Sequence, residues 1–517
     1  MEKRLSFGNI ELALAASRAP SASSEIKSKR FPILVLGDFS GRASRGVMDP
    51  ACIAKCRPIE VDRDNVDDVM KKLQVAVELP VGSSGNSRMS VSCSELDDFH
   101  PDRLFGRLEL FDRLRQTRRR LGNASTFEAA AAEIRAWGTA VPDQPVPKSP
   151  SPSVPAPLPE NLLDLVVGGE GPNVALPRPA GSVDWNSMIQ EIVGPYVVKA
   201  TDARQPELLK IVDQIVGEEM RRILHHPEFQ AIEAAWRGVD FLVRRLETDE
   251  ELKVALVDIS RDELVADLAA SDDLSSTGLF KFLVEQTVGT PGGQPWAVLA
   301  GNYAFDATAE EIGVLGRLAR IAKLARAPWL AAGTSRFLGC ESIVATPDPD
   351  DWTIPLAGDE ADAWRELRAL PEADALSIAL PRMLGRVPYG KSSNPTEQIA
   401  FEEMPTGHHH QAYHWLNPIF ACACALGQGF SDRGWSLRPN TFVEFDRMPM
   451  HVYKEDGESA VKPCAEVLLT ERASERIDHL GLVGLISVKG TDRLRVPGVR
   501  PVTTSTNGLF GRWRASN

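Results

Sequence analysis

Long apolar runs are missing from the sequence. No stretch reaches the roughly 18 apolar residues of a membrane-spanning helix, and residues 1–20 lack the apolar run of a secretory signal. The seven cysteines are scattered and odd in number, so no disulfide framework is indicated and a reducing compartment fits best. We therefore expect a cytoplasmic protein that is not inserted in a membrane.

Positive charge is also scarce. The chain has 58 Lys and Arg against 71 Asp and Glu, which gives a net charge of −13. Binding to nucleic acid or to an anionic membrane surface needs a basic face, so the balance argues against both. What is present, 43% hydrophobic and 25% charged residues, is the composition of a globular protein. A chain of 517 residues is too long for one compact core and predicts roughly three or four domains.

One segment has the composition of a linker. Residues 141–160 contain eight prolines in twenty positions, and a Gly-rich stretch follows at residues 168–181. Proline lacks the backbone donor and favours an extended conformation, so such a run acts as a semi-rigid spacer. We expect a first unit at residues 1–140, a linker at 141–183 and a larger unit at 184–517.

The hydrophobic patterns of both units predict a mixed α/β fold. In the first unit, Asp64 or Asn65 is expected to cap a helix, and Leu104, Leu108, Phe111 and Leu114 predict one helix that ends near Gly122. In the second unit, an apolar stripe from Phe229 to Val243 places Trp236 in the core, with Pro227 in the first turn. The expected strands are residues 31–37, 59–62, 75–81, 89–93, 252–259, 296–301 and 376–380, and further helices are expected at 209–223, 277–287 and 309–326.

Three consecutive arginines, Arg118, Arg119 and Arg120, close the predicted helix of the first unit. Cations at a helix C-terminus interact favourably with its dipole, so a solvated helix end explains them. A contact with an acidic partner is the alternative.

An octet at residues 385–392, from Gly385 to Ser392, fits the phosphate-loop pattern G-x-x-x-x-G-K-[ST]. The strand-like VALVD at 254–258 resembles the strand whose terminal Asp holds magnesium in such proteins. A phosphate loop needs free amides and a helix that starts at the Lys-Ser pair. Pro388 and Pro395 remove amides from both places. We interpret the octet as a coincidence and expect no nucleotide to bind.

Other candidate sites are weak. His410 and His414 are four residues apart and could share a helix face as metal ligands, but no carboxylate motif completes such a site, so surface or packing roles are favoured for His408, His409, His410 and His414. Cys422 and Cys424 lie in an apolar run and are expected to be buried.

Carboxylates do not assemble a reaction centre either. Adjacent pairs such as Glu402 and Glu403, or Asp97 and Asp98, point in different directions, which favours capping or solvated roles. No nucleophile, base and orienting acid come together in the sequence. We expect no catalysis, no metal and no cofactor, and a function in binding or assembly.

Several long strings, in order along the chain, resemble a known family. FPILVLGDFSGR (31–42), IEVDRDNVDDVM (59–70) and ELDDFHPDRL (95–104) resemble the small subunit of the type VI secretion contractile sheath. ILHHPEFQAIEAAWRGVDFLV (223–243), VALVDIS (254–260), LPRMLGRVPYGKSSNPTEQIAFEE (380–403) and KPCAEVLLTER (462–472) resemble the large subunit. The sequence looks like a fusion of two chains that are usually separate.

The resemblance implies a non-enzymatic sheath-type subunit of a contractile injection machine, built as two α/β units that dock tightly. Implied partners are other copies or sheath-type subunits, the inner-tube protein and baseplate components. A ring-shaped disassembly ATPase is a further candidate.

Two departures from the family leave other functions open. Large subunits continue past the segment that matches residues 479–494, whereas this chain stops at Asn517. The linker also replaces the N-terminal helix and linking strand of the large subunit. Only a short apolar stretch remains there: Leu162, Leu163, Leu165, Val166 and Val167. This apolar trace and the three arginines 118–120 together form our candidate interface. A cap, baseplate or adaptor protein that forms no long sheath is one alternative, and a P-loop nucleotide-binding protein is another.

Overall fold

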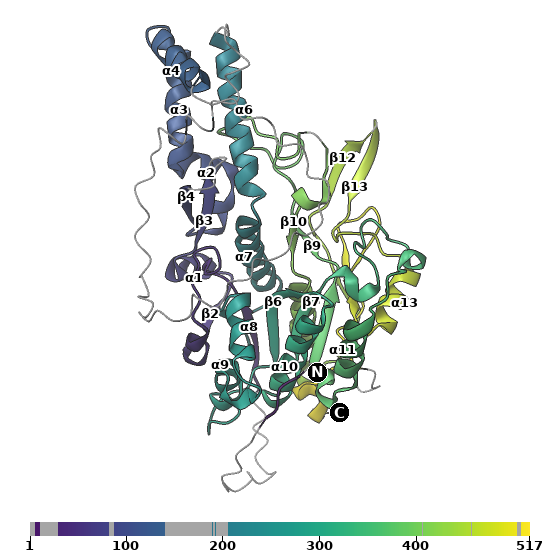
Figure 1. The fold of residues 1–517 in the computed structure, drawn as a ribbon. Coiled ribbons are helices and arrows are strands. Elements are labelled where there is room, and N and C mark those ends of the chain that lie inside the picture. Colours follow the sequence, from purple (N-terminus) through teal and green to yellow (C-terminus); the bar gives the residue numbers. More distant parts are fainter. Residues whose placement is uncertain are drawn as a thin grey trace, which may run out of the picture. The chain divides into compact units, whose positions relative to one another are not determined.

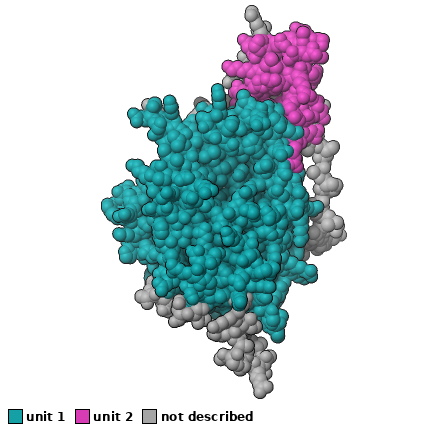
Figure 2. All heavy atoms as spheres, turned by 180° about the vertical axis from the view of Figure 1, so that it is seen from behind, with its two compact units in different colours: residues 1–79, 90–106, 220–517 teal, residues 80–89, 107–219 magenta. Residues whose placement is uncertain are grey.

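The computed structural model describes residues 6–10, 29–81, 87–139, 189, 192, 205–405, 407–455, 457–503 and 508–516 (Figure 1). The proline-rich segment and the apolar trace from Leu162 to Val167 lie outside these residues, so the division of the chain at the linker stays a prediction. Two compact units are present, coloured in Figure 2. The first comprises residues 1–79, 90–106 and 220–517, and the second comprises residues 80–89 and 107–219.

A seven-stranded sheet forms the centre of the first unit, in the order β14-β8-β7-β6-β1-β5-β2. All neighbouring strands are parallel except β2, which is antiparallel to β5. The strands are β1 (Phe31–Gly37), β2 (Ile59–Val61), β5 (Leu252–Asp258), β6 (Val298–Phe305), β7 (Trp329–Gly333), β8 (Leu376–Leu380) and β14 (Val483–Gly484). This arrangement confirms the mixed α/β fold predicted from the sequence.

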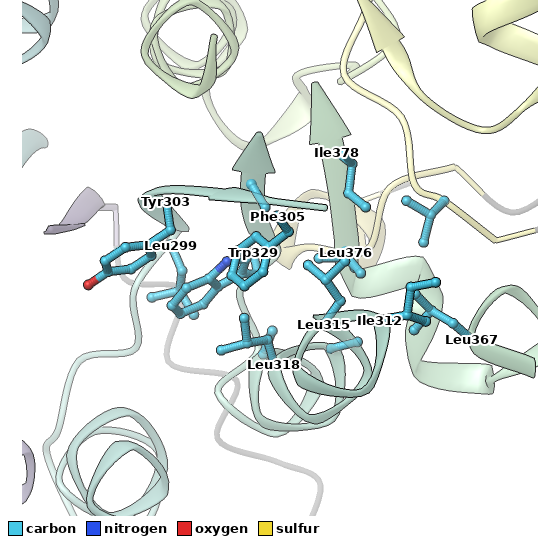
Figure 3. Packing of buried hydrophobic residues seen from close by; sticks show 14 of the residues in the cluster. Leu299, Tyr303, Phe305, Ile312, Leu315, Leu318, Trp329, Leu367, Leu376 and Ile378 are labelled. Carbon is cyan, nitrogen blue, oxygen red and sulfur yellow. The ribbon is translucent and has the colours of Figure 1, made fainter. Parts of the chain in front are cut away.

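Helices cover both faces of the sheet, which explains why its strands are almost continuously apolar. On one face, Leu315 and Leu318 of α10 pack with Phe305, Trp329 and Leu376 of the strands (Figure 3). On the other face, α12 packs against β1, β6 and β7 and against α7. The helices of this unit are α1 (Val66–Leu73), α2 (Pro101–Arg107), α7 (Pro227–Arg245), α8 (Arg261–Ala269), α9 (Gly278–Phe280), α10 (Ala309–Leu324), α11 (Gly358–Ala369), α12 (Ile419–Arg433) and α13 (Glu471–His479).

Smaller sheets contain the remaining strands. Among the described residues, three of these sheets are two-stranded and one has three strands in the order β11-β16-β15. The pairs are β3 (Ala76–Val81) with β4 (Ser87–Ser92), β9 (Met383–Arg386) with β10 (His414–Leu416), and β12 (His451–Glu455) with β13 (Glu458–Lys462). The three-stranded sheet contains β11 (Val443–Phe445), β15 (Ile486–Ser487) and β16 (Leu494–Val496).

The second unit is helical. It contains α3 (Glu109–Gly122), α4 (Phe127–Thr139) and the part of α6 (Gln205–Leu224) that ends at Glu219. Each helix contributes buried apolar side chains, such as Leu114 from α3 and Val212 from α6. A side-chain hydrogen bond from Gln205 Nε2 to the carbonyl of Leu121, at 2.7 Å, also joins α6 to α3.

Most predicted elements are present, with three corrections. The helix expected between Leu104 and Gly122 is two helices, because Leu108 is extended (φ −78°, ψ 130°) and separates α2 from α3. Asn65 precedes α1 but makes no capping hydrogen bond, since its Oδ1 accepts from the amide of Asp62 at 2.9 Å instead. The segment expected as one helix at 277–287 is the short α9 followed by a π-helical turn, Lys281–Glu285.

Candidate functional site: an interlaced sheet and a buried charge network

The segments before and after the linker, residues 1–140 and 184–517, both contribute strands to the central sheet. Strand β1, from the first segment, lies between β5 and β6 of the second. Its partners run from Leu252 to Asp258 on one side and from Val298 to Gly301 on the other. Because a central strand supplies hydrogen bonds to both neighbours, each segment completes the sheet of the other. Residues 31–37 of the first segment are thus part of the central sheet, whereas docking of the complete segments stays a prediction.

The turn after β1 is fixed by carboxylates of the second segment. The carboxylate of Asp258 accepts hydrogen bonds from the amides of Phe39 (2.8 Å) and Ser40 (3.0 Å) and from Ser40 Oγ (2.7 Å). Arg42 Nε donates to Glu263 Oε2 at 2.9 Å. Burial alone would raise the pKa of Glu263, but the hydrogen bond from Arg42 lowers it to about 2. Asp258, which in the sequence resembled a magnesium ligand, therefore holds a backbone turn.

Trp236 joins this turn to α7. The ring is fully buried, and its Nε1 donates to the carbonyl oxygen of Phe39 at 2.8 Å. The rings of Trp236 and Phe39 meet edge to face, with centroids 5.7 Å apart. The core position predicted for Trp236 is confirmed, as is Pro227 in the first turn of α7.

A buried charge network centred on Arg386 includes side chains of α7. Arg386 Nε donates to Glu233 Oε1 at 2.8 Å, and Nη1 donates to Glu403 Oε2 at 2.8 Å. The side chains of Glu233 and Glu403 are 0% and 1% exposed. Burial opposes ionisation, yet the charge of Arg386 outweighs it and lowers the pKa of Glu403 to about 2 and that of Glu233 further. Both carboxylates are therefore ionised at neutral pH.

Two more charged or titratable side chains face Glu233. Arg237, one turn along α7, donates from Nε to Oε1 at 2.7 Å. His414 on β10 is buried, with Nε2 3.5 Å from Oε2. Burial lowers the pKa of His414 to about 4, so the imidazole is neutral at physiological pH.

The octet at 385–392 contributes to this network. Residues of β9 open it, and a turn follows at Lys391 and Ser392 where a phosphate loop needs a helix. The amide of Tyr389 donates to Glu403 Oε2 at 2.8 Å, and the amide of Lys391 donates to Glu402 Oε1 at 3.0 Å. The amides that would hold a phosphate thus bind carboxylates of the same chain.

This network was not predicted from the sequence. The capping or solvated role expected for Glu403 is wrong, because Glu403 is buried against Arg386. A signal was present in α7: Glu233 lies four residues after Phe229 and three before Trp236, on the core-facing side of the helix. A carboxylate at such a position needs a cation, and no sequence spacing identifies Arg386 as that cation. For Asp98 the capping role is confirmed, since its carboxylate accepts from the amide of the N-cap residue Glu95 at 3.3 Å.

The histidines do not form the helix face considered from the sequence. His410 lies in a 3₁₀ turn and His414 in β10, so the shared helix face is wrong. Within the described ranges no group of three or more His, Cys, Asp or Glu has the geometry of a metal site. Cys422 and Cys424 are buried in α12, as predicted, and burial raises the pKa of each thiol to about 12.

The three arginines lie in the last turns of α3. Arg118 Nη2 donates to Asp213 Oδ2 of α6 at 3.1 Å, and Arg120 pairs with Glu133 of α4 at 2.7 Å. Arg119 is exposed, and no carboxylate among the described residues pairs with it. Two of the three thus form ion pairs with other helices of this unit.

No helix in the described part of the chain is both long enough and apolar enough to span a membrane. Comparisons with known proteins identify the chain more closely. The family VipB, described as EvpB/VC_A0108, tail sheath N-terminal domain, matches residues 207–502. The family T6SS_VipA, described as type VI secretion system, VipA, VC_A0107 or Hcp2, matches residues 19–134.

A curated relative agrees with both matches. Over 291 residues the chain is 31% identical to the type VI secretion system sheath protein TssC1 of Pseudomonas aeruginosa. The alignment covers 55% of this chain and 58% of that protein, so it spans less than two thirds of the relative's length. Since the VipB match covers more than half of the chain, and a VipA match precedes it, this protein belongs to the type VI tail sheath family and carries the VipA-type and VipB-type segments in one chain.

Proposed function

We propose that this protein is a structural, non-enzymatic subunit of a type VI secretion-like contractile injection machine, and that it assembles with other copies as a sheath around an inner tube. The observation that carries the proposal is the position of β1, from the VipA-type segment, between β5 and β6 of the VipB-type segment. A pair of segments that share one sheet forms a single repeat, and identical repeats joined head to tail generate helical assemblies.

The proposal includes partners and a location. A sheath subunit contacts other sheath-type subunits, the inner-tube protein and baseplate components, and a disassembly ATPase is a further candidate partner. A machine that pushes a tube outward from the cell interior assembles in the cytoplasm, and the negative net charge of the chain fits such protein partners better than nucleic acid.

Negative-stain electron microscopy of the purified chain, alone and with the inner-tube protein of the same organism, tests the function. Hollow helical tubes of regular diameter are the expected result. Rings or short stacks that do not lengthen with the tube protein would instead favour a cap, baseplate or adaptor role. A protein that stays monomeric at every concentration, with and without the tube protein, would contradict both.

We also propose contacts for assembly. Arg119 is exposed and lacks a described carboxylate partner, unlike Arg118 and Arg120, so it is suited to an acidic surface of a neighbouring subunit. Arg119→Glu should reduce assembly in sedimentation at low salt while leaving the melting temperature unchanged. Arg113→Glu, on an exposed arginine paired with Glu109, is the matched control. Equal assembly by both variants would remove Arg119 from the interface.

The apolar trace Leu162, Leu163, Leu165, Val166 and Val167 remains a second candidate contact. We expect this short apolar segment of the proline-rich linker to pair with an edge strand of a neighbouring copy. Edge strands have backbone N–H and C=O groups without hydrogen-bond partners. Replacing Leu163 and Val166 together by Asp should abolish tubes. Unchanged tubes would show that the apolar trace is not used.

A further inference from the structure

The hairpin β12–β13 depends on its base for its order. Its two strands pair from His451 with Lys462 to Glu455 with Glu458, and they form a sheet of only two strands. Val452 and Val461 on its outer face are 54% and 39% exposed. A two-stranded hairpin alone is at best marginally stable in water. The contacts at its base therefore decide whether it stays ordered.

Two imidazoles face each other at that base. His451 on β12 is 5% exposed, and its Nδ1 is 2.9 Å from the hydroxyl of Tyr413. The ring of His408 lies 5.2 Å from that of His451 and 3.9 Å from that of Tyr453, between ring centroids. Nδ1 of His408 is buried and has no hydrogen-bond partner among the described residues. Once protonated, His451 has no ring nitrogen left to accept a hydrogen bond from the Tyr413 hydroxyl.

The surroundings of the imidazoles disfavour further positive charge. His451 lies directly opposite Lys462 in the hairpin register, and like charges in that position are destabilising. Lys462 Nζ in turn lies 2.9 Å from His410 Nδ1. The other ring nitrogen of His410, Nε2, lies 3.1 Å from Glu466 Oε1.

The nearby carboxylates are already engaged. Glu466 pairs with Arg382 and His410, Glu403 pairs with Arg386, and Glu455 lies exposed at the far end of β12. Burial, followed by the charge of His408, lowers the pKa of His451, while Glu403 opposes this weakly. Burial also lowers the pKa of Lys462.

We propose that the hairpin β12–β13 is a pH-sensitive element: protonation of His451 releases its base, and the hairpin loses its order while the central sheet stays folded. The released hairpin binds one more proton than the docked one, because the imidazole of His451 regains water. Docking is therefore complete above the ordinary histidine pKa of about 6.5 and weakens as the pH falls below it. Each proton taken up shifts the equilibrium by up to about tenfold per pH unit.

Hydrogen exchange of the full chain, followed by mass spectrometry at about pH 7.5 and about pH 5.5, tests the proposal. Protection factors are compared, because they remove the intrinsic pH dependence of exchange. Peptides that cover residues 451–462 should lose about tenfold or more in protection at the lower pH. Peptides from β1 and β5 should change far less. Equal protection of the hairpin at both values, or a parallel loss in the central sheet, would overturn it.

Substitutions assign the effect to His451. His408→Phe keeps a ring against Tyr453 and His451, so the pH response should persist in this variant. His451→Phe removes the titrating group and should abolish the pH response. If His451→Phe does not fold, His451→Gln decides, since an unchanged response in it would contradict the proposal. His479→Gln, on an exposed histidine of α13, is the matched control and should respond like the parent.

Discussion

The central sheet and the charge network around Arg386 lie in the same compact unit and are stabilised in opposite ways. In the sheet, apolar side chains are removed from water on both faces, and each contact contributes independently of its partner's exact chemistry. In the network, two carboxylates are kept ionised in a buried site by one guanidinium, so each member depends on the others. A sheet position therefore tolerates conservative change, whereas a network position does not.

Helix α7 takes part in both regions. Trp236 packs against Phe39 beside the end of β1, and Glu233, three residues earlier, binds Arg386. The same helix therefore joins the interlaced sheet to the motif at residues 380–403. Four substitutions or conditions separate the two kinds of stabilisation.

The largest effect is expected from Trp236→Ala. It removes a fully buried indole and leaves the carbonyl of Phe39 without its donor. We expect a loss of about 3–5 kcal/mol for the cavity and about 1 kcal/mol more for the carbonyl, measured by urea unfolding. Phe442→Ala, at a side chain that is 52% exposed, should cost about 0.5 kcal/mol or less. Similar losses in the two variants would show that burial of Trp236 contributes little.

Arg386→Met should cost about 3–5 kcal/mol, because it leaves Glu233 and Glu403 buried without their cation. Arg244→Met breaks an exposed pair with Asp240 on α7 and should cost about 0.5 kcal/mol. Adding Glu233→Gln and Glu403→Gln to Arg386→Met should recover part of the stability, since no charge then stays unpaired. A triple variant less stable than Arg386→Met alone would contradict this explanation.

The pH dependence of unfolding should report His414. Its pKa is about 4 in the folded protein, against a reference value of 6.5 that applies to the unfolded chain. Between pH 6.5 and pH 4, His414 is therefore protonated in the unfolded chain and neutral in the folded protein. Stability should therefore fall by up to about 3 kcal/mol as the pH falls from 6.5 to 4. The carboxylate of Glu403, with its pKa lowered to about 2, loses its contribution only below about pH 4.5. His414→Gln should flatten the upper window, whereas His479→Gln should not; an unchanged profile in His414→Gln would contradict the assignment.

The smallest effect is expected from Lys391→Ala. The side chain is exposed and its amide, not its ammonium, binds Glu402, so stability should change by about 0.5 kcal/mol or less. Calorimetry with ATP and magnesium should show no binding to the parent. Micromolar binding of ATP that disappears in Lys391→Ala would restore the phosphate-loop interpretation. The carboxylates of Glu402 and Glu403 would then have to release the amides of Lys391 and Tyr389.

Local patterns in the sequence determined the elements and the family. The apolar run of residues 31–37 predicted β1, and the stripe around Trp236 predicted the buried face of α7, because both signals depend only on neighbours along the chain. The ordered strings of both sheath subunits identified the family from the same kind of short-range information.

Tertiary structure alone decided which distant residues meet. The insertion of β1 between β5 and β6 depends on strand order, which no local pattern contains. Arg386 lies 153 residues from Glu233 in the sequence. Their pairing follows from the packing of β9 against α7. Periodicity reports which side of an element is buried, and only the folded chain determines what is buried with it.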